Sequence, residues 1–442
     1  MSYPDSRLVY NHSVMKTVAR LRGILARLDP KPVALGKIHQ FGGCRRYAYN
    51  RLLAEREAAW KALGASPDVE TKKAFNREWY YVGMTHKITL WRSKLEWLRA
   101  CPVHVLQNAA WDLQDAYEKW WKGLAKRPRF KKKSHGADSW TESDPACFGV
   151  NGQAVKLPKI GWVRARISQR IEGVVKRITV KQEGEHWHAS LLVEEAVEEP
   201  KPNGKPAVGL DLGVVHDVAD SDGNIYDTLT RTKEEKRRLR RLARAVSRKK
   251  KGSRNREKAK RKLNRARLRI DRRIRHEIHV LTCRLAKNHG LVAIEDLDVK
   301  GMTGSAAGTL EAPGRNVGAK RGLNREILER RWGETRRQLG YKCPWNGSRL
   351  VAVPAPYSSQ ECSSCGHADK QNRPSQAVFQ CVSCGHEENA DVNAAKVIRK
   401  RGIVLAAGHA ATACGEDVRP PRKRRRTSVK QEPSEGAHTC VA

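Results

Sequence analysis

The sequence has few acidic residues and no long apolar run. Its 442 residues include 47 Asp and Glu against 87 Lys and Arg, which gives a formal net charge of +40. No apolar run approaches the ~20 residues that a membrane-spanning helix needs, and the N-terminus lacks the pattern of a secretory signal peptide. We therefore expect neither a membrane-embedded nor an exported protein, and a cytoplasmic location.

The excess of positive charge indicates a polyanionic partner. Like charges on this scale repel one another and contribute nothing to stability by themselves. Nucleic acid is the first candidate for the compensating partner, and the protein would then lie on the nucleoid of a prokaryotic cell when it is bound to DNA. A merely solvated basic surface is the alternative, but such a surface normally carries comparable numbers of acidic residues.

Four of the eleven cysteines form two Cys-x-x-Cys pairs. Cys362 and Cys365 are followed, after 15 residues, by Cys381 and Cys384, and each pair continues with Gly-His. Two such pairs supply four thiolates for one tetrahedral Zn²⁺ ion, and the spacing disfavours unliganded or redox-active cysteines. We expect a closed structural zinc site in a reducing compartment, with the two following histidines outside it.

Three short apolar segments each deliver one acidic residue. Residues 208–213 and 291–297 are typical of buried strands that end in a carboxylate, and residues 389–395 are typical of the start of a helix. Taken singly, such an acid more often caps an element or is solvated. The three acids are Asp211, Glu295 and Asp391.

The order of elements predicts that these acids meet. A strand with a turn and further strands, a helix, a strand ending in Glu295, and a helix starting near Asp391 is the order of an RNase H-like domain. Adjacent parallel strands would place Asp211 beside Glu295. Carboxylate oxygens suit hard cations such as Mg²⁺ or Mn²⁺, and two such ions about 4 Å apart activate a water and stabilise the leaving oxygen of a phosphodiester.

The remaining segments divide into helical and strand-rich parts. Residues 41–125 repeat apolar side chains at helical spacing, residues 174–193 predict a hairpin, and residues 231–288 predict a basic helical hairpin. Residues 301–323 predict a mobile loop, followed by a helix through Leu339. Most tryptophans of the first helical part are expected to pack in the core, which leaves one or two that could stack on bases. These tryptophans are Trp91, Trp97, Trp111, Trp120 and Trp121.

Two basic segments are candidates for contact with phosphates. One follows the first helical part and the other is the turn of the basic helical hairpin. A charge run is usually a solvated face, but these runs are nearly of one sign. The candidate nucleic-acid-binding residues are Arg127, Arg129, Lys131, Lys132, Lys133, Arg248, Lys249, Lys250, Lys251, Arg254 and Arg256.

Together, these motifs resemble a known family. The three acidic segments are similar to the split motifs of a RuvC nuclease domain, with the cysteine pairs between the second and third. Residues 357–366 and 391–395 resemble the C-terminal signature of TnpB, the transposon-encoded RNA-guided nuclease, and of the miniature type V CRISPR effectors. The likeness extends through residues 41–50, 127–132 and 322–328, and so covers roughly residues 41–435.

The resemblance implies a multidomain α+β protein. It would contain a helical recognition domain, a small β-barrel wedge domain, and an RNase H-like (RuvC) α/β domain with an inserted zinc ribbon. The expected boundaries are residues 1–40 for an N-terminal segment that is a candidate part of the wedge domain, 41–136 for the recognition domain, 137–200 for the wedge domain, 201–354 for the first part of RuvC, 355–388 for the ribbon, 389–410 for the closing helix and 411–442 for a disordered basic tail.

The resemblance also implies a function. The protein would bind a guide RNA, recognise a short flanking motif in double-stranded DNA, form an RNA–DNA hybrid and cut DNA strands by two-metal chemistry. Asp211, Glu295 and Asp391 would take the catalytic, magnesium-binding positions, and the four paired cysteines the zinc positions. Two alternatives stay open: an RNA-guided binder or repressor that does not cleave, and a guide-independent nuclease or transposase.

Overall fold

The computed structural model describes residues 17–64, 67–133, 139–309 and 311–412. The chain divides into two compact units, one formed by residues up to 200 with 233–271, the other by residues 201–232 with those from 272 onward. The predicted basic tail lies outside the described residues, except for its first two positions, which belong to the last helix. None of the described helices combines the length and apolar character that a membrane-spanning segment needs.

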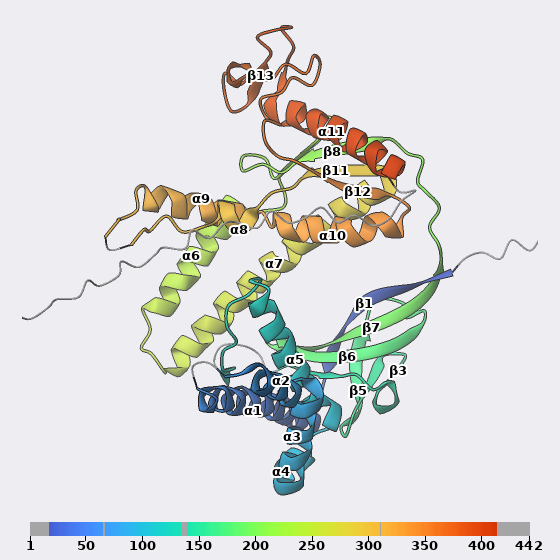
Figure 1. The fold of residues 1–442 in the computed structure, drawn as a ribbon, viewed down its shortest axis with the longest axis vertical. Helices are drawn as coiled ribbons and strands as arrows, with labels where there is room; N and C mark the ends of the chain where they lie inside the picture. The colour runs from blue at the N-terminus through green and yellow to red at the C-terminus, as the bar shows by residue number, and fades with distance from the viewer. Residues whose placement is uncertain (1–16, 65–66, 134–138, 310, 413–442) are drawn as a thin grey trace, which may run out of the picture. The chain divides into compact units, whose positions relative to one another are not determined.

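The first unit contains a seven-stranded antiparallel sheet (Figure 1). Its strand order is β2-β6-β7-β1-β5-β4-β3, so β2 and β3 are its edges among the described strands. Among the described strands the sheet is a half-barrel with β2 and β3 unpaired on their outer sides, where the resemblance implies a small β-barrel. The strands are β1 (Thr17–Asp29), β2 (Ser139–Glu142), β3 (Gly149–Asn151), β4 (Ala154–Leu157), β5 (Gly161–Ile167), β6 (Val174–Glu183) and β7 (His186–Glu198). The last two form the predicted hairpin.

The central strand β1 comes from the N-terminal segment, for which the residue pattern predicts no particular element. It pairs with β7 on one side and β5 on the other. Arg20 and Arg22 share one face of β1 with the buried Ile24, and the residues between them are exposed. Two arginines on the inner face obscure the apolar alternation that would identify a strand. Both guanidiniums donate hydrogen bonds to the buried carboxylate of Glu195, at 2.7 and 3.1 Å, which neutralises the arginines where a strand pattern would show apolar residues.

The helices of the first unit share a core with this sheet. They are α1 (Pro32–Ala62), α2 (Val69–Glu78), α3 (Tyr81–Lys94), α4 (Glu96–Arg99) and α5 (Val103–Trp121). The indole of Trp140 on β2 is fully buried, lies 5.6 Å from the Phe41 ring of α1 and donates a hydrogen bond to the Ile38 carbonyl at 3.2 Å. A single hydrophobic cluster thus includes helical and strand residues, where separate recognition and wedge domains were expected.

The tryptophans of the helical part are mostly not core residues. Only Trp91 of the five is buried, at 6% exposed, while Trp97, Trp111, Trp120 and Trp121 are 38% to 55% exposed. The prediction that most of them pack in the core is therefore wrong. The helical spacing does hold for the aliphatic positions, since Leu106, Ala110 and Leu113 of α5 are fully buried.

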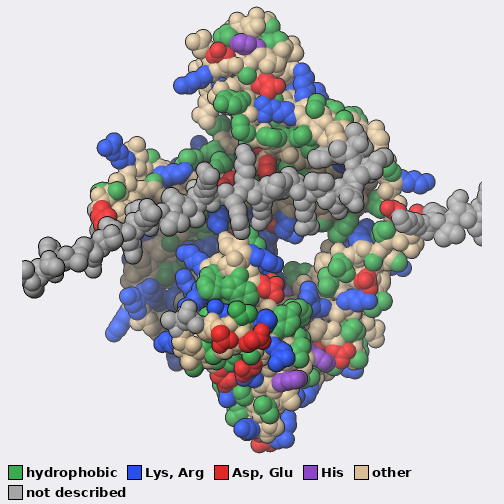
Figure 2. All heavy atoms as spheres, viewed as in Figure 1, with side chains coloured by type: hydrophobic (Ala, Val, Ile, Leu, Met, Phe, Trp, Pro, Cys, Tyr) green, Lys and Arg blue, Asp and Glu red, His purple; other side chains and the backbone are tan. Residues whose placement is uncertain are grey.

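The predicted basic hairpin is present as α6 (Lys233–Ser247) and α7 (Arg254–Asn288). The apolar stripe of α7 is buried, including Ile270, Ile274 and Ile278, whereas α6 has no buried residue. The Arg256 guanidinium donates to the Lys249 carbonyl at 2.8 Å and closes the turn between the helices. Lys and Arg side chains gather over this hairpin on the face drawn in Figure 2.

The second unit is built on a five-stranded mixed sheet of order β10-β9-β8-β11-β12. The strands are β8 (Ala207–Asp211), β9 (Val218–Asp220), β10 (Ile225–Tyr226), β11 (Leu291–Glu295) and β12 (Arg349–Val353). β8, β11 and β12 run parallel, and β9 and β10 continue the sheet antiparallel. The other elements of this unit are α8 (Val299–Met302), α9 (Val317–Glu329), α10 (Trp332–Trp345), β13 (Val378–Gln380), β14 (Glu387–Asn389) and α11 (Ala390–Thr412).

Two boundaries in this unit differ from the predicted ones. The expected loop over residues 301–323 ends earlier, because α9 already begins at Val317. The expected single helix through Leu339 is two helices, α9 and α10, separated at Arg331, whose backbone is left-handed with φ of 53°. A non-glycine residue in that conformation cannot continue a right-handed helix.

Candidate functional site

The carboxyl ends of β8 and β11 place two of the predicted acids side by side. The parallel register pairs Leu291 with Ala207 and Ile294 with Leu210. Asp211 and Glu295 are the next residues on their strands, so they end at the same edge of the sheet. Glu295 is 9% exposed and Asp211 is partly buried.

Helix α11 brings the third acid to this edge because it lies directly on β8. A Cβ atom at Gly209 would lie 2.0 Å from the Ala395 carbonyl oxygen and 2.5 Å from the Arg399 amide nitrogen, so only glycine allows this approach. Gly209 and Asp211 share one face of the strand, and Asp391 and Ala395 share one face of the helix. The contact at Gly209 therefore turns Asp391 toward Asp211.

Asp211 feels the negative charge of both other acids. Burial, together with the negative charges of Glu295 and Asp391, raises the pKa of Asp211 to about 7. Burial also raises the pKa of Glu295, although a hydrogen bond from Ser358 opposes that rise. Carboxylates in such a group disfavour one another's ionisation, and a cation placed among them would reverse this effect.

In the described part of the chain, two further side chains contact the acids, and no sequence pattern predicts either contact. The Ser358 hydroxyl donates to Glu295 Oε1 at 2.5 Å, and Arg373 Nη2 lies 3.3 Å from Asp391 Oδ1. Both residues come from the segment around the cysteine pairs. Neither has a diagnostic spacing, and only the folded chain brings them to the sheet edge.

The donor set fits hard divalent cations. Three carboxylates and a serine hydroxyl offer only oxygen atoms, which suit Mg²⁺ or Mn²⁺. The three acids are not among the described groups whose ligand atoms all lie within 4.8 Å of one another.

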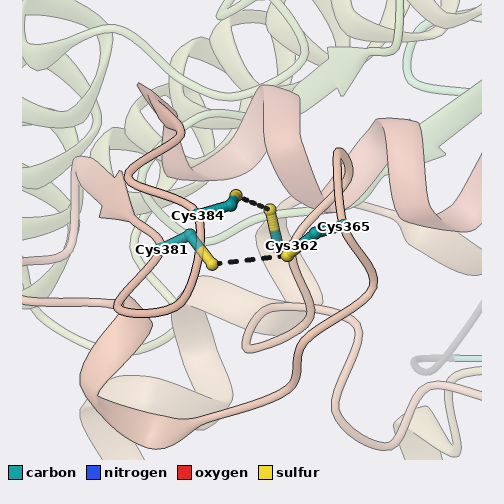
Figure 3. A group of neighbouring side chains, drawn as sticks. All are labelled: Cys362, Cys365, Cys381 and Cys384. Carbon is teal, nitrogen blue, oxygen red and sulfur yellow. Dashed lines mark hydrogen bonds between the residues drawn. The ribbon is translucent and has the colours of Figure 1, made fainter.

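The four paired cysteines converge as the sequence predicts (Figure 3). The sulfur atoms of Cys362 and Cys384 are 3.8 Å apart, and those of Cys365 and Cys381 are 3.6 Å apart. A Zn²⁺ ion with four Zn–S bonds of about 2.3 Å places its sulfurs about 3.8 Å apart, so both distances are compatible with a tetrahedral zinc ion. The imidazole of His386 lies 3.4 Å from a Glu388 oxygen, and neither His367 nor His386 belongs to the group.

Asn372, which the sequence analysis did not single out, joins the two cysteine turns. It is fully buried, and its side-chain nitrogen donates to the carbonyls of Gln360 and His367 at 2.8 and 3.0 Å. Its side-chain oxygen accepts from the Val382 amide at 2.9 Å. Because Arg373 is the next residue, the packing of this turn also sets where the Arg373 guanidinium meets Asp391.

The predicted phosphate-binding residues differ in their solvent exposure and in their contacts with acidic side chains. Lys131 lies 3.1 Å from Asp112 and 3.9 Å from the centre of the Tyr49 ring, and burial lowers its pKa. Arg127 lies 3.1 Å from Glu57 but is 58% exposed. The remaining candidates are exposed or half-buried: Arg129, Lys132, Lys133, Arg248, Lys249, Lys250, Lys251, Arg254 and Arg256.

A row of arginines on α6, which includes Arg237, Arg241 and Arg244, was not among the predicted residues. These arginines line a shallow groove.

Three family models match the chain. The model described as "Probable transposase" (OrfB_IS605) matches residues 190–306, the "Cas12f1-like, TNB domain" matches residues 332–398, and a "Helix-turn-helix domain" (HTH_OrfB_IS605) matches residues 15–65. In the structure, the described part of that last segment is the strand β1 followed by the single continuous helix α1, not two helices joined by a turn.

Two curated proteins are similar over nearly the whole chain. The "Putative RNA-guided DNA endonuclease InsQ" of Escherichia coli (strain K12) is 39% identical over 94% of this chain and 98% of its own length. The "Putative RNA-guided DNA endonuclease" of Streptomyces pristinaespiralis is 33% identical over 93% of this chain and 96% of its own. Among solved structures, a Cas12f1–sgRNA–target DNA complex aligns with a TM-score of 0.47 at 12% identity, over 87% of this chain and 99% of that chain. On the full-length sequence matches, the chain belongs to the TnpB/IS605 OrfB family, whose curated members here carry the name putative RNA-guided DNA endonuclease.

Proposed function

We propose that this protein is an RNA-guided DNA endonuclease that cuts DNA strands at Asp211, Glu295 and Asp391. The observation that carries the proposal is the convergence of these three acids at one edge of a mixed sheet, in a chain of net charge +40. The sheet order supports the proposal, because three parallel strands continued on the β8 side by β9 and β10 match the order expected of an RNase H-like domain. The names of the full-length relatives support a guide RNA and a DNA target.

Each acid has a distinct part in the proposed chemistry. Bound Mg²⁺ or Mn²⁺ would activate a water and stabilise the leaving oxygen of the phosphodiester. Asp211, between the other two acids, would be shared by the ions, while Glu295 and Asp391 would each complete one site. Ser358 orients the Glu295 carboxylate, and Arg373 neutralises Asp391 when no cation does so.

The basic surface would hold the nucleic acids by their backbones. Base pairing between guide and target would supply sequence choice, with a short flanking motif read by the protein. The exposed arginines and lysines of the α6–α7 hairpin and of the segment after α5 are the proposed contacts. The four cysteines with the β13–β14 ribbon would form the zinc-binding insert, which supports Arg373 and the start of α11.

The decisive experiment compares the wild type with Asp211→Asn, purified with its copurifying RNA. The variant should bind that RNA as the wild type does but lose Mg²⁺-dependent cleavage, because Asn cannot supply the shared anionic ligand. Glu387→Gln, an exposed substitution on β14, is the matched control and should cleave normally. Metal-dependent cutting by Asp211→Asn would contradict the assignment of the site.

The same preparation separates the alternatives. One discrete copurifying RNA species supports guidance, whereas random RNA fragments favour a guide-independent nuclease. A wild type that binds matched DNA in Mg²⁺ but leaves it intact would indicate an RNA-guided binder. The three neighbouring acids count against that binder, since their mutual repulsion is a cost that DNA binding alone does not require.

A further inference from the structure

A second cluster of metal-type ligands lies in the first unit of the structure. It contains His104 near the start of α5, Glu142 at the end of β2, and Cys147 at the end of the short 3-10 helix Pro145–Cys147. One ligand atom from each of the three lies within 4.8 Å of the others. Nothing in the RNA-guided nuclease proposal uses these residues.

A fourth donor, Asp144, stands next to this cluster. His104 Nδ1 is 3.0 Å from Glu142 Oε1 and 3.9 Å from Asp144 Oδ2, and the Cys147 sulfur is 3.3 Å from the same Asp144 oxygen. Bonds of about 2.0–2.3 Å to one tetrahedral zinc ion hold its ligand atoms roughly 3.3–3.8 Å apart. The measured distances bracket that range, so small side-chain movements would complete the geometry.

The buried carboxylate of Glu142 lacks a full set of partners. Its side chain is 0% exposed, and Oε1 accepts hydrogen bonds from the amides of Ser143 and Asp144 at 2.9 and 3.0 Å. Its other oxygen, Oε2, is buried without a hydrogen-bond partner. A buried charged oxygen with no partner is costly, and a cation is the kind of ligand that would satisfy it.

We propose that His104, Glu142, Asp144 and Cys147 form a second, structural Zn²⁺ site. The set of one nitrogen, two oxygens and one sulfur favours zinc over Mg²⁺, which avoids thiolate ligands. Three of the ligands come from the six residues 142–147, and the fourth comes from the start of α5. The ion would therefore clamp this helix to the edge strand β2 of the half-barrel.

The test is the zinc content of the full-length protein, measured by native mass spectrometry and elemental analysis after dialysis against a zinc buffer that saturates the four-cysteine site. The wild type should hold two zinc ions per chain. His104→Ala, Glu142→Gln and Cys147→Ser should each hold one. Cys283→Ser, which removes a half-buried thiol outside both clusters, should still hold two.

Two outcomes would overturn this proposal. A wild type with a single zinc ion, lost in Cys362→Ser, would overturn the second site and leave His104 and Glu142 as an ordinary ion pair. Retention of two ions by all three cluster variants would also overturn it. Circular dichroism on each variant, together with retention of the first zinc ion, distinguishes loss of the ligand from loss of the fold. Because the experiment measures zinc stoichiometry and not cleavage, a result that overturns the second zinc site would leave the proposed nuclease function untouched.

Discussion

Substitution of Gly209 by alanine tests whether the contact between β8 and α11 positions the acids. The new Cβ atom would lie 2.0 Å from the Ala395 carbonyl oxygen, whereas ordinary van der Waals contacts begin at 3.4 Å. The helix backbone must therefore retreat by about 1.4 Å, the difference between these two distances. Since the Ala395 oxygen belongs to the backbone and the alanine Cβ atom is fixed to its own backbone, no rotamer change can relieve the clash.

The retreat should separate Asp391 from Asp211 by a similar amount. A displacement of about 1 Å in a catalytic constellation can cost about 100-fold in rate, so we expect Gly209→Ala to lose at least that much Mg²⁺-dependent cleavage. Overpacking of this kind costs about 1–3 kcal/mol of stability, which should lower the unfolding temperature by several degrees without preventing folding. RNA binding should be unchanged.

The assay is single-turnover cleavage of a matched DNA with the copurified RNA, alongside thermal unfolding. Gly340→Ala on α10 is the control, because a Cβ atom there meets nothing within 4 Å. It should leave cleavage unchanged and should not lower the unfolding temperature, since alanine favours a helix interior more than glycine does. A folded Gly209→Ala protein that cleaves at the wild-type rate would refute the reasoning: the acids would then not depend on this contact.

Two further predictions concern the first unit. Glu195→Gln should lower the free energy of unfolding by about 1–3 kcal/mol at neutral pH, because Arg20 and Arg22 lose a charged partner. Burial alone would raise the pKa of Glu195, but the hydrogen bonds from both arginines outweigh burial and lower this pKa. The stabilisation is therefore present above the unfolded-state pKa of about 4.3 and is lost as the pH falls through the lower folded-state pKa. Urea unfolding should therefore show the two proteins converging in acid, with exposed Glu198→Gln as control; a gap that persists there would contradict the linkage. Replacing Arg237, Arg241 and Arg244 by alanine should weaken RNA binding regardless of sequence and flatten its dependence on log salt by up to about 0.7 per lost phosphate contact, whereas an unchanged slope would exclude this face of α6.

The candidate site was more predictable from sequence than the architecture around the helical part. Asp211 and Glu295 were predictable because a short apolar run that ends in an acid is a local pattern, and the four cysteines because their spacing is itself the signal. Ser358 and Arg373 were not, since their proximity to the acids arises only after the cysteine segment folds back on the sheet. The significance of Gly209 likewise depends on a helix almost two hundred residues later in the chain.

The strand β1 shows why sequence patterns fail near paired charges. Arg20 and Arg22 occupy inward positions that a strand pattern reserves for apolar side chains, and their partner Glu195 lies in a distant segment. The prediction that most tryptophans are buried is wrong for a different reason. Helical spacing marks a residue as able to share a face with its neighbours, but only the packed structure shows which face is covered, and most of these indoles lie on the uncovered one.

The buried contact of Trp140 with α1 has a consequence for engineering smaller versions of this protein. Since α1, α5 and the half-barrel close over the same interior, the helical part cannot be excised or exchanged as an independent cassette. A deletion that removed α1 would expose Trp140 together with the aliphatic side chains around it, and a graft would have to reproduce the complementary surface residue by residue. Trimming should instead start at exposed turns that carry none of the proposed phosphate contacts, such as the one between β3 and β4.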